Sequence, residues 1–313
     1  MDFGEIILDL LSSATCGETS INMLSKQLKE NGFSGDYKNT YQKIMKFEKD
    51  NLLITTQIGK SKTISLNYQN PKTISKLAIM ELSKKIDFIE KNQNFSKILL
   101  DLQAITSEFI LMTNPQKNIN LNRIEILILT ENPLETLKKC NGIEEKYSIR
   151  IDCLALKNKD FAKLIKSNNS TIAEMLTNKI ILTNQEHFFE LAGDILAKNN
   201  LNRRNYSLTD LNEAEIRYNL SKFGYSEFGK ELKSKELSFE ESIISTLILG
   251  TARQKTALKN LIIKNEFNPE LLAFFAKKYS KQKEIQTLIN NNKTNPKLNE
   301  LNKLMSWMKM ISW

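Results

Sequence analysis

Basic and amide side chains recur at helical spacing near the start of this 313-residue chain. They are Lys38, Asn39, Gln42, Lys43 and Lys46. On an α-helix, spacings of three and four residues place most of them on one stripe. A helix with such a stripe fits the major groove of double-stranded DNA, where amides can read adenine edges and lysines can bind phosphates or guanine.

A second basic pair follows the stripe. Lys60 and Lys62 flank Ser61 in a short turn, from which they could reach phosphates or the minor groove. Together the stripe and the pair predict contact with DNA. The alternative is that these lysines form an ordinary solvated surface, since the chain has 45 Lys and Arg residues against 36 Asp and Glu.

Three helices and a hairpin must position these side chains. The apolar pattern predicts helices over residues 3–11, 21–28 and 36–50, with Thr19 or Ser20 capping the second and Asp36 the third. Residues 52–58 and 63–67 have the β-branched and alternating patterns of two paired strands. We expect four residues of the third helix to face the core: Tyr37, Tyr41, Ile44 and Met45.

In this order of elements, residues 1–70 resemble the winged helix-turn-helix domains of archaeal and bacterial transcription factors. The resemblance implies that the third helix is the recognition helix and that the hairpin is the wing. Residues 71–94 are predicted as a long amphipathic helix, which would serve as a linker or as a dimerisation helix.

The middle third changes character. Residues 123–129 form an apolar run in which neither face is spared, as in a strand covered on both sides, and residues 148–156 are predicted as a second strand. Helical patterns lie around them, and residues 109–112 and the end of 172–182 are short strand candidates. This alternation predicts a small α/β domain over residues 95–195.

The α/β segment resembles the nucleotidyltransferase superfold. That resemblance implies a Gly-Ser turn for phosphates and three carboxylates that hold two Mg²⁺ ions. Here the turn falls on Met112 and Thr113, and the first carboxylate position holds Arg123. The second and third positions keep Glu125 and Asp152.

We therefore expect a degenerate, catalytically inactive domain with a relic nucleotide or metal site at Thr113, Glu125 and Asp152. A cation at position 123 repels Mg²⁺, and we expect it to pair with Glu125. Two alternatives are that Glu125 and Asp152 are ordinary polar residues at a sheet edge, and that a non-catalytic nucleotide pocket survives.

Residues 200–313 are predicted to be entirely helical. Parts of this region are similar to the helical tails of archaeal nucleotidyltransferase-like proteins, a resemblance that implies no function. We expect Arg253 to form a surface ion pair and the apolar end around Met305 and Trp307 to dock onto the helical domain.

Composition excludes several classes of protein. Three cysteines, Cys16, Cys140 and Cys153, have no metal-binding spacing, and the single histidine, His187, leaves little room for a Ser–His or Cys–His pair. No apolar run is long enough for a membrane span, and the N-terminus is acidic rather than signal-like. We expect a cytoplasmic protein with reduced thiols, no membrane contact, no metal and no cofactor.

The sequence thus predicts a multidomain, mostly α protein that includes an α/β part. Its predicted segments are a winged helix (1–70), a linker helix (71–94), a nucleotidyltransferase-like domain (95–195) and a helical domain (200–313). The predicted function is transcriptional regulation, with the remaining domains binding a nucleotide or protein effector or forming a homodimer. The alternatives are a metal-dependent nucleotidyltransferase acting on RNA or protein, and a winged-helix scaffold that binds protein.

Overall fold

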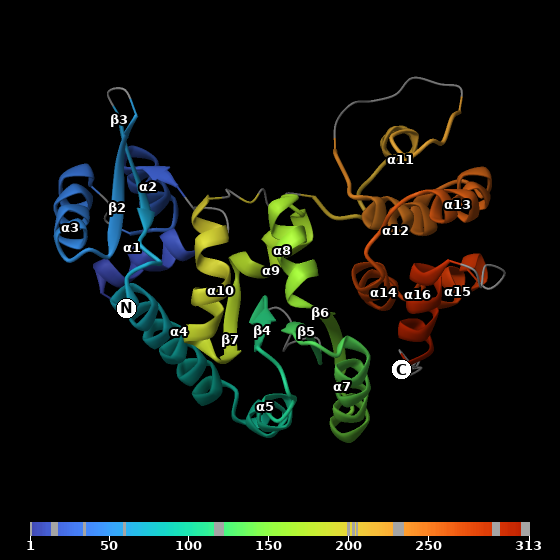
Figure 1. Ribbon diagram of the computed structural model, residues 1–313, viewed down its shortest axis with the longest axis horizontal. Helices are drawn as coiled ribbons and strands as arrows, with labels where there is room; N and C mark the ends of the chain where they lie inside the picture. The colour runs from blue at the N-terminus through green and yellow to red at the C-terminus, as the bar shows by residue number, and fades with distance from the viewer. Residues whose placement is uncertain are drawn as a thin grey trace. The chain divides into compact units, whose positions relative to one another are not determined.

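The computed structural model is mostly helical and contains two small sheets, as the sequence predicts (Figure 1). It describes residues 2–13, 18–33, 36–58, 61–115, 122–198, 201, 204, 206–227, 235–289 and 295–307. In this part of the chain no helix has both the length and the hydropathy to cross a membrane.

The chain forms two compact units. The N-terminal unit comprises Met1–Leu121, Leu127–Leu129 and Asn158–Arg204. The C-terminal unit comprises Asn122–Ile126, Thr130–Lys157 and Asn205–Trp313. This division runs through the predicted domain at 95–195, because one strand of its sheet contributes residues to both units.

The first elements are α1 (Phe3–Ser12), β1 (Thr19–Ser20), α2 (Ile21–Glu30), α3 (Tyr37–Lys49), β2 (Leu53–Ile58) and β3 (Ser61–Leu66). The Ser20 hydroxyl caps α2 and the Asp36 carboxylate caps α3, as predicted. The three strands form an antiparallel sheet in the order β1-β3-β2. The sequence analysis missed β1, because a two-residue strand has no pattern of its own.

The side of α3 that faces the core differs from the prediction. Thr40, Ile44 and Phe47 are buried, whereas Tyr37 and Tyr41 are 50% and 37% exposed. Tyr41 lies about 100° around the helix from Thr40, so burying Thr40 turns Tyr41 outward. The predicted core positions of the two tyrosines are therefore wrong, while that of Ile44 is confirmed.

The chain continues through α4 (Pro71–Lys91), a 3₁₀ turn η1 (Gln93–Phe95), α5 (Ser96–Gln103) and β4 (Phe109–Thr113). Next come β5 (Arg123–Leu129), α7 (Pro133–Tyr147), β6 (Arg150–Leu156), α8 (Asn158–Lys166), α9 (Ser170–Thr177), β7 (Lys179–Thr183) and α10 (Gln185–Lys198).

The second sheet has the strand order β6-β5-β4-β7. Strands β4 and β7 are antiparallel. Strand β6 runs parallel to β5, since the amides of Arg150 and Thr130 donate to the carbonyls of Asn122 and Leu156. Nearly every residue of β4, β5 and β6 is buried. For β5 this confirms the expectation of a strand covered on both sides.

The remaining elements are helices, as predicted. They are α11 (Glu213–Ser221), α12 (Phe239–Leu249), α13 (Ala252–Lys264), α14 (Pro269–Lys278), α15 (Gln282–Ile289) and α16 (Pro296–Trp307). Helix α14 is buried on almost all sides, with Phe274 and Phe275 fully enclosed. It is the central helix of the C-terminal unit. Met305 of α16 is also buried, as expected for an apolar end that docks, whereas Trp307 is 41% exposed. Residues 308–313 lie outside the described residues.

Gly193 of α10 lies against the Tyr68 ring, where an added Cβ would approach the ring carbon Cδ1 to 2.2 Å. We expect Gly193→Ala to lower the free energy of unfolding by about 1–3 kcal/mol, because the buried ring must shift. Gly142→Ala in α7 is the matched control. Nothing lies within 4 Å of that position, so the substitution should stabilise the chain by about 0.5–1 kcal/mol. Thermal or denaturant unfolding of both variants measures the difference, and a destabilisation shared by both would contradict it.

Candidate functional site

The third carboxylate of the predicted relic site is paired with two cationic side chains. Asp152 in β6 is fully buried, and its carboxylate forms ion pairs with Arg123 of β5 and Arg150 of β6. The Arg150 pair joins Nε to Oδ1 at 3.2 Å. A buried carboxylate with two guanidinium partners is compensated without a metal ion.

The second carboxylate has its own cation. Glu125 Oε2 lies 2.8 Å from Lys278 Nζ, at the end of α14, and both side chains are largely buried. The expectation that Arg123 would pair with Glu125 is therefore wrong. The physical reason lies in the parallel register of β5 and β6, which brings Arg123 to Asp152 on the neighbouring strand. Asp152 does lie on β6, an edge strand of the sheet, and Glu125 lies on the inner strand β5; both carboxylates are buried.

A third buried pair lies close in the chain to these two. Lys277 Nζ contacts Glu144 Oε2 at 2.8 Å, and the Ile151 amide donates to Glu144 Oε1 at 2.6 Å. Arg150 also donates to the backbone carbonyls of Lys277 and Lys278. A cation at these carbonyls suits the C-terminus of α14, where helix carbonyls lack internal partners. Burial raises the pKa of the Glu144 carboxyl, and the Lys277 ammonium acts in the opposite direction.

The position of the expected phosphate turn is not a turn. Met112 and Thr113 are the last residues of β4, both are fully buried, and their Cα partners in β7 are Ile180 and Lys179. Thr113 belongs to the N-terminal unit, whereas Glu125 and Asp152 belong to the C-terminal unit. Among the described residues, no group of three or more His, Cys, Asp or Glu side chains is placed to hold a metal ion.

Among the described residues, the thiol of Cys153 is not activated as a nucleophile. Cys140 and Cys153 are buried free thiols, and burial together with the neighbouring Cys140 raises the pKa of the Cys153 thiol well above its usual value. A thiol held protonated is a poor nucleophile. His187 lies on α10 beside Glu108 and Glu190, with 44% of its side chain exposed. Cys16 lies outside the described residues.

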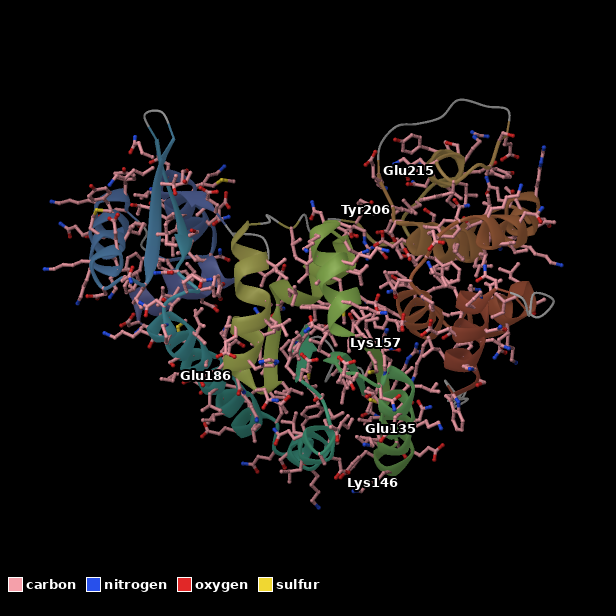
Figure 2. All side chains as sticks on the ribbon, viewed as in Figure 1. Glu135, Lys146, Lys157, Glu186, Tyr206 and Glu215 are labelled. Atoms are coloured by element: carbon pink, nitrogen blue, oxygen red, sulfur yellow. The ribbon has the colours of Figure 1, made fainter. Side chains whose placement is uncertain are left out.

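Four of the five predicted stripe residues are exposed on α3: Lys38, Asn39, Gln42 and Lys46. In Figure 2, nitrogen-tipped side chains project from α3 on the side away from β2. Lys43 is the exception. It is half-buried against Gly4 of α1, with its ammonium 5.4 Å from the centre of the Phe47 ring.

The structure makes Asn39 less suited to the base contact that the sequence predicts for it. Its side-chain amide donates to Asp36 Oδ2 at 3.2 Å, so contact with a base would compete with the helix cap. Gln42 is the more accessible amide on the outward face.

The sequence analysis missed three other residues on this face. Lys49 is exposed one turn beyond Lys46, and the outward Tyr37 and Tyr41 rings stack with their centres 6.1 Å apart. Lys38, Gln42 and Lys49 are spaced by four and seven residues, a signal that could have placed Lys49 on the stripe. In the hairpin, Lys62 is exposed in β3 opposite Gln57, whereas Lys60 lies outside the described residues.

Comparisons with protein-family models, with curated proteins and with solved structures found no match to this chain. Function must therefore be argued from these residues alone.

Lys278→Met tests the compensation of the buried carboxylates. It leaves Glu125 without its cation, and we expect a loss of about 3 kcal/mol in the free energy of unfolding. Lys281→Met is the matched control. Its partner Glu284 is 43% exposed, so that change should cost at most about 1 kcal/mol.

The double variant Glu125→Leu/Lys278→Met should recover most of the lost stability, because no buried charge remains unpaired. Denaturant titration of the four proteins gives the result. Equal losses for Lys278→Met and Lys281→Met would show that the Glu125 pair contributes no more than a surface pair.

Proposed function

We propose that this chain is a DNA-binding transcriptional regulator whose first 70 residues form a winged helix-turn-helix domain. The observation that carries the proposal is the exposed face of α3. It presents lysines and one accessible amide beside a hairpin whose sheet has the order β1-β3-β2. In such a domain α3 would lie in the major groove and the hairpin would contact the phosphate backbone.

The side chains of α3 suit different parts of the duplex. Lys38, Lys46 and Lys49 would bind phosphates, and Gln42 would read a base edge. The hydroxyl groups of Tyr37 and Tyr41 could donate to phosphate oxygens. Lys43, which packs on α1, would hold α3 in place rather than contact DNA.

We propose that the nucleotidyltransferase-like segment has no catalytic role. Binding two Mg²⁺ ions at Glu125 and Asp152 would require Arg123, Arg150 and Lys278 to give up buried carboxylate partners. Each step would leave a charge unpaired in the interior, which costs several kcal/mol.

A protein-binding scaffold is the second candidate, and exposed apolar residues favour it. Met23, Phe33, Tyr37 and Tyr41 are 37–58% exposed in the same N-terminal segment. Salt dependence separates the two functions. Contact with DNA releases counterions from phosphates, so its affinity falls steeply with salt, whereas an apolar protein interface has a weak dependence.

The triple variant Lys38→Ala/Lys46→Ala/Lys49→Ala tests the phosphate contacts. It should weaken binding to any duplex and reduce the slope of log affinity against log salt by about 2–3 units. The control removes three exposed lysines from α8, by Lys159→Ala, Lys163→Ala and Lys166→Ala. Both triples change the net charge equally, so only a local contact distinguishes them. Equal effects of the two triple variants on DNA binding would contradict the assignment of α3 as the DNA-contacting helix.

Gln42→Ala tests base reading. At the preferred site it should cost about 1–3 kcal/mol of binding free energy while leaving random-sequence binding nearly unchanged. Lys62→Ala should instead weaken both kinds of site and lower the salt slope by about one unit. Fluorescence anisotropy with specific and random duplexes at two salt concentrations separates these patterns, and a Gln42→Ala effect of equal size on both duplexes would contradict base reading.

We also propose that the regulator is a homodimer through α4. Ile79, Leu82 and Ile86 are 44–65% exposed on one face of this helix. An antiparallel pair of α4 helices would place Ile79 opposite Ile89 of a second copy and Leu82 opposite its Ile86. In the same pairing the flanking Lys76 would lie near Glu90 of the second copy, which gives one complementary pair of charges.

Leu82→Glu tests the dimer. The apolar interface between the two α4 helices would then contain two buried carboxylates, one from each copy. We therefore expect the apparent mass in light scattering to fall from that of a dimer to that of a monomer. Leu100→Glu on α5 is the matched control, because Leu100 is 66% exposed and does not belong to the apolar face of α4. A monomeric wild-type chain, or a dimer unaffected by Leu82→Glu, would exclude this interface.

A further inference from the structure

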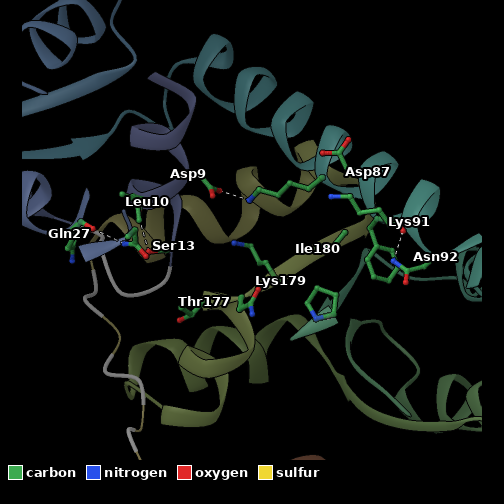
Figure 3. Close-up of a pocket in the computed structure, with 15 residues that line it drawn as sticks. Asp9, Leu10, Ser13, Gln27, Asp87, Lys91, Asn92, Thr177, Lys179 and Ile180 are labelled. Atoms are coloured by element: carbon green, nitrogen blue, oxygen red, sulfur yellow. Dashed lines mark hydrogen bonds and ion pairs between the residues drawn. The ribbon is translucent and has the colours of Figure 1, made fainter. Parts of the chain in front are cut away.

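A polar cavity of about 540 Å³ lies within the N-terminal unit (Figure 3). Side chains from α1, α2, α4, the end of α9 and β7 line it. Small-molecule sites typically enclose about 300–1,000 Å³, so the cavity has room for a metabolite. None of its lining residues belongs to the relic carboxylate site.

One cation in the cavity is already neutralised. The Lys84 ammonium contacts both Asp9 of α1 and the buried Glu81 of its own helix. Figure 3 shows Asp9 on α1 with a dashed line that marks this ion pair. Lys84 therefore holds α1 against α4 and is not available to a ligand.

Lys179 is a second cation in the lining, and it is buried without a carboxylate in direct contact among the described residues. Lys179 is 8% exposed and extends from β7 into the space between α1 and α4 (Figure 3). Its ammonium donates to the Leu176 carbonyl at 3.2 Å and lies 5.4 Å from the centre of the Phe188 ring. Among the described residues neither Lys179 nor Lys91, which also lines the cavity, is in an ion pair. An ammonium has three donors, so Lys179 can donate to a further acceptor.

We infer that this cavity binds a small anionic ligand through a phosphate or carboxylate group held by Lys179 and Lys91. Such a group would form charge-assisted hydrogen bonds with the buried ammonium. The amides of Asn92 and Asn178 lie in the same lining and can donate to further ligand oxygens. Asp87 is the remaining carboxylate of the lining, and it opposes the anion.

Proton binding should be linked to ligand binding. Burial lowers the pKa of the Lys179 ammonium, while the nearby Glu81 and Asp9 act to raise it and Lys84 to lower it. Lys91 and Asp87 are the other charged groups of the lining. Because the anion requires the protonated amine, its affinity should fall as pH rises toward the lowered pKa, earlier than for an ordinary lysine.

If the proposed function holds, this cavity is the effector site of the regulator. Helices α1 and α2 line it, and α2 packs against α3. That extension rests on the proposed function, but ligand binding does not, because it is measured in the absence of DNA. The two ideas can therefore fail separately.

The test is calorimetric titration of the full chain with two probes, inorganic phosphate and citrate, at constant ionic strength. We expect saturable binding of at least one probe, and the probe that binds more tightly identifies the preferred group. Lys179→Met should weaken binding roughly tenfold or more, and Lys91→Met several-fold. Asp87→Asn should strengthen binding, because it removes the opposing charge.

Lys85→Met is the matched control. Lys85 lies on α4 and donates to the Leu182 carbonyl at 2.7 Å, and burial also lowers its pKa, but it does not line the cavity. Its substitution should leave binding unchanged. Lys91 and Asp87 are exposed, so we expect their variants to fold. These variants therefore test ligand binding even if Lys179→Met unfolds. Absence of saturable binding by the wild-type chain, or equal affinities for wild type, Lys91→Met and Asp87→Asn, would overturn the inference.

Discussion

The buried carboxylate of Asp152 sets the main constraint on the C-terminal unit. A carboxylate removed from water must have a compensating cation, and here Arg123 and Arg150 provide it. Arg150 also donates to the last carbonyls of α14, those of Lys277 and Lys278. The side chains of the same two lysines pair with Glu144 and Glu125. These ion pairs and hydrogen bonds thus connect β5, β6, α7 and the end of α14. Removing Asp152 would leave Arg123 and Arg150 without the carboxylate that they share.

This constraint also decides where function can lie. A two-metal site needs carboxylate oxygens that are free to bind Mg²⁺, and the oxygens of Glu125 and Asp152 already accept from cations of the chain itself. Both carboxylates therefore serve packing. The exposed side of α3 lies outside these buried pairs, and its lysines and Gln42 remain accessible to a partner. Its chemistry therefore supports recognition of a polyanion.

The sequence predicted elements well wherever the signal was local. The unbroken apolar run of residues 123–129 became β5, and Asp36 capped α3. The failures concern contacts between distant residues. Nothing near Glu125 indicates Lys278, which lies about 150 residues further along the chain, and Arg123 pairs with Asp152 because of a strand register that periodicity does not reveal. The tyrosines of α3 were misplaced because an aromatic residue at helical spacing suits either a core or a recognition surface.

The most direct test of the central claim is selection of bound sequences from a random duplex library by the full wild-type chain in the presence of EDTA. The account predicts enrichment of a common site without any divalent metal, and an affinity for that site that falls steeply as salt increases. Failure to enrich any sequence, or enrichment only when Mg²⁺ is added, would contradict it.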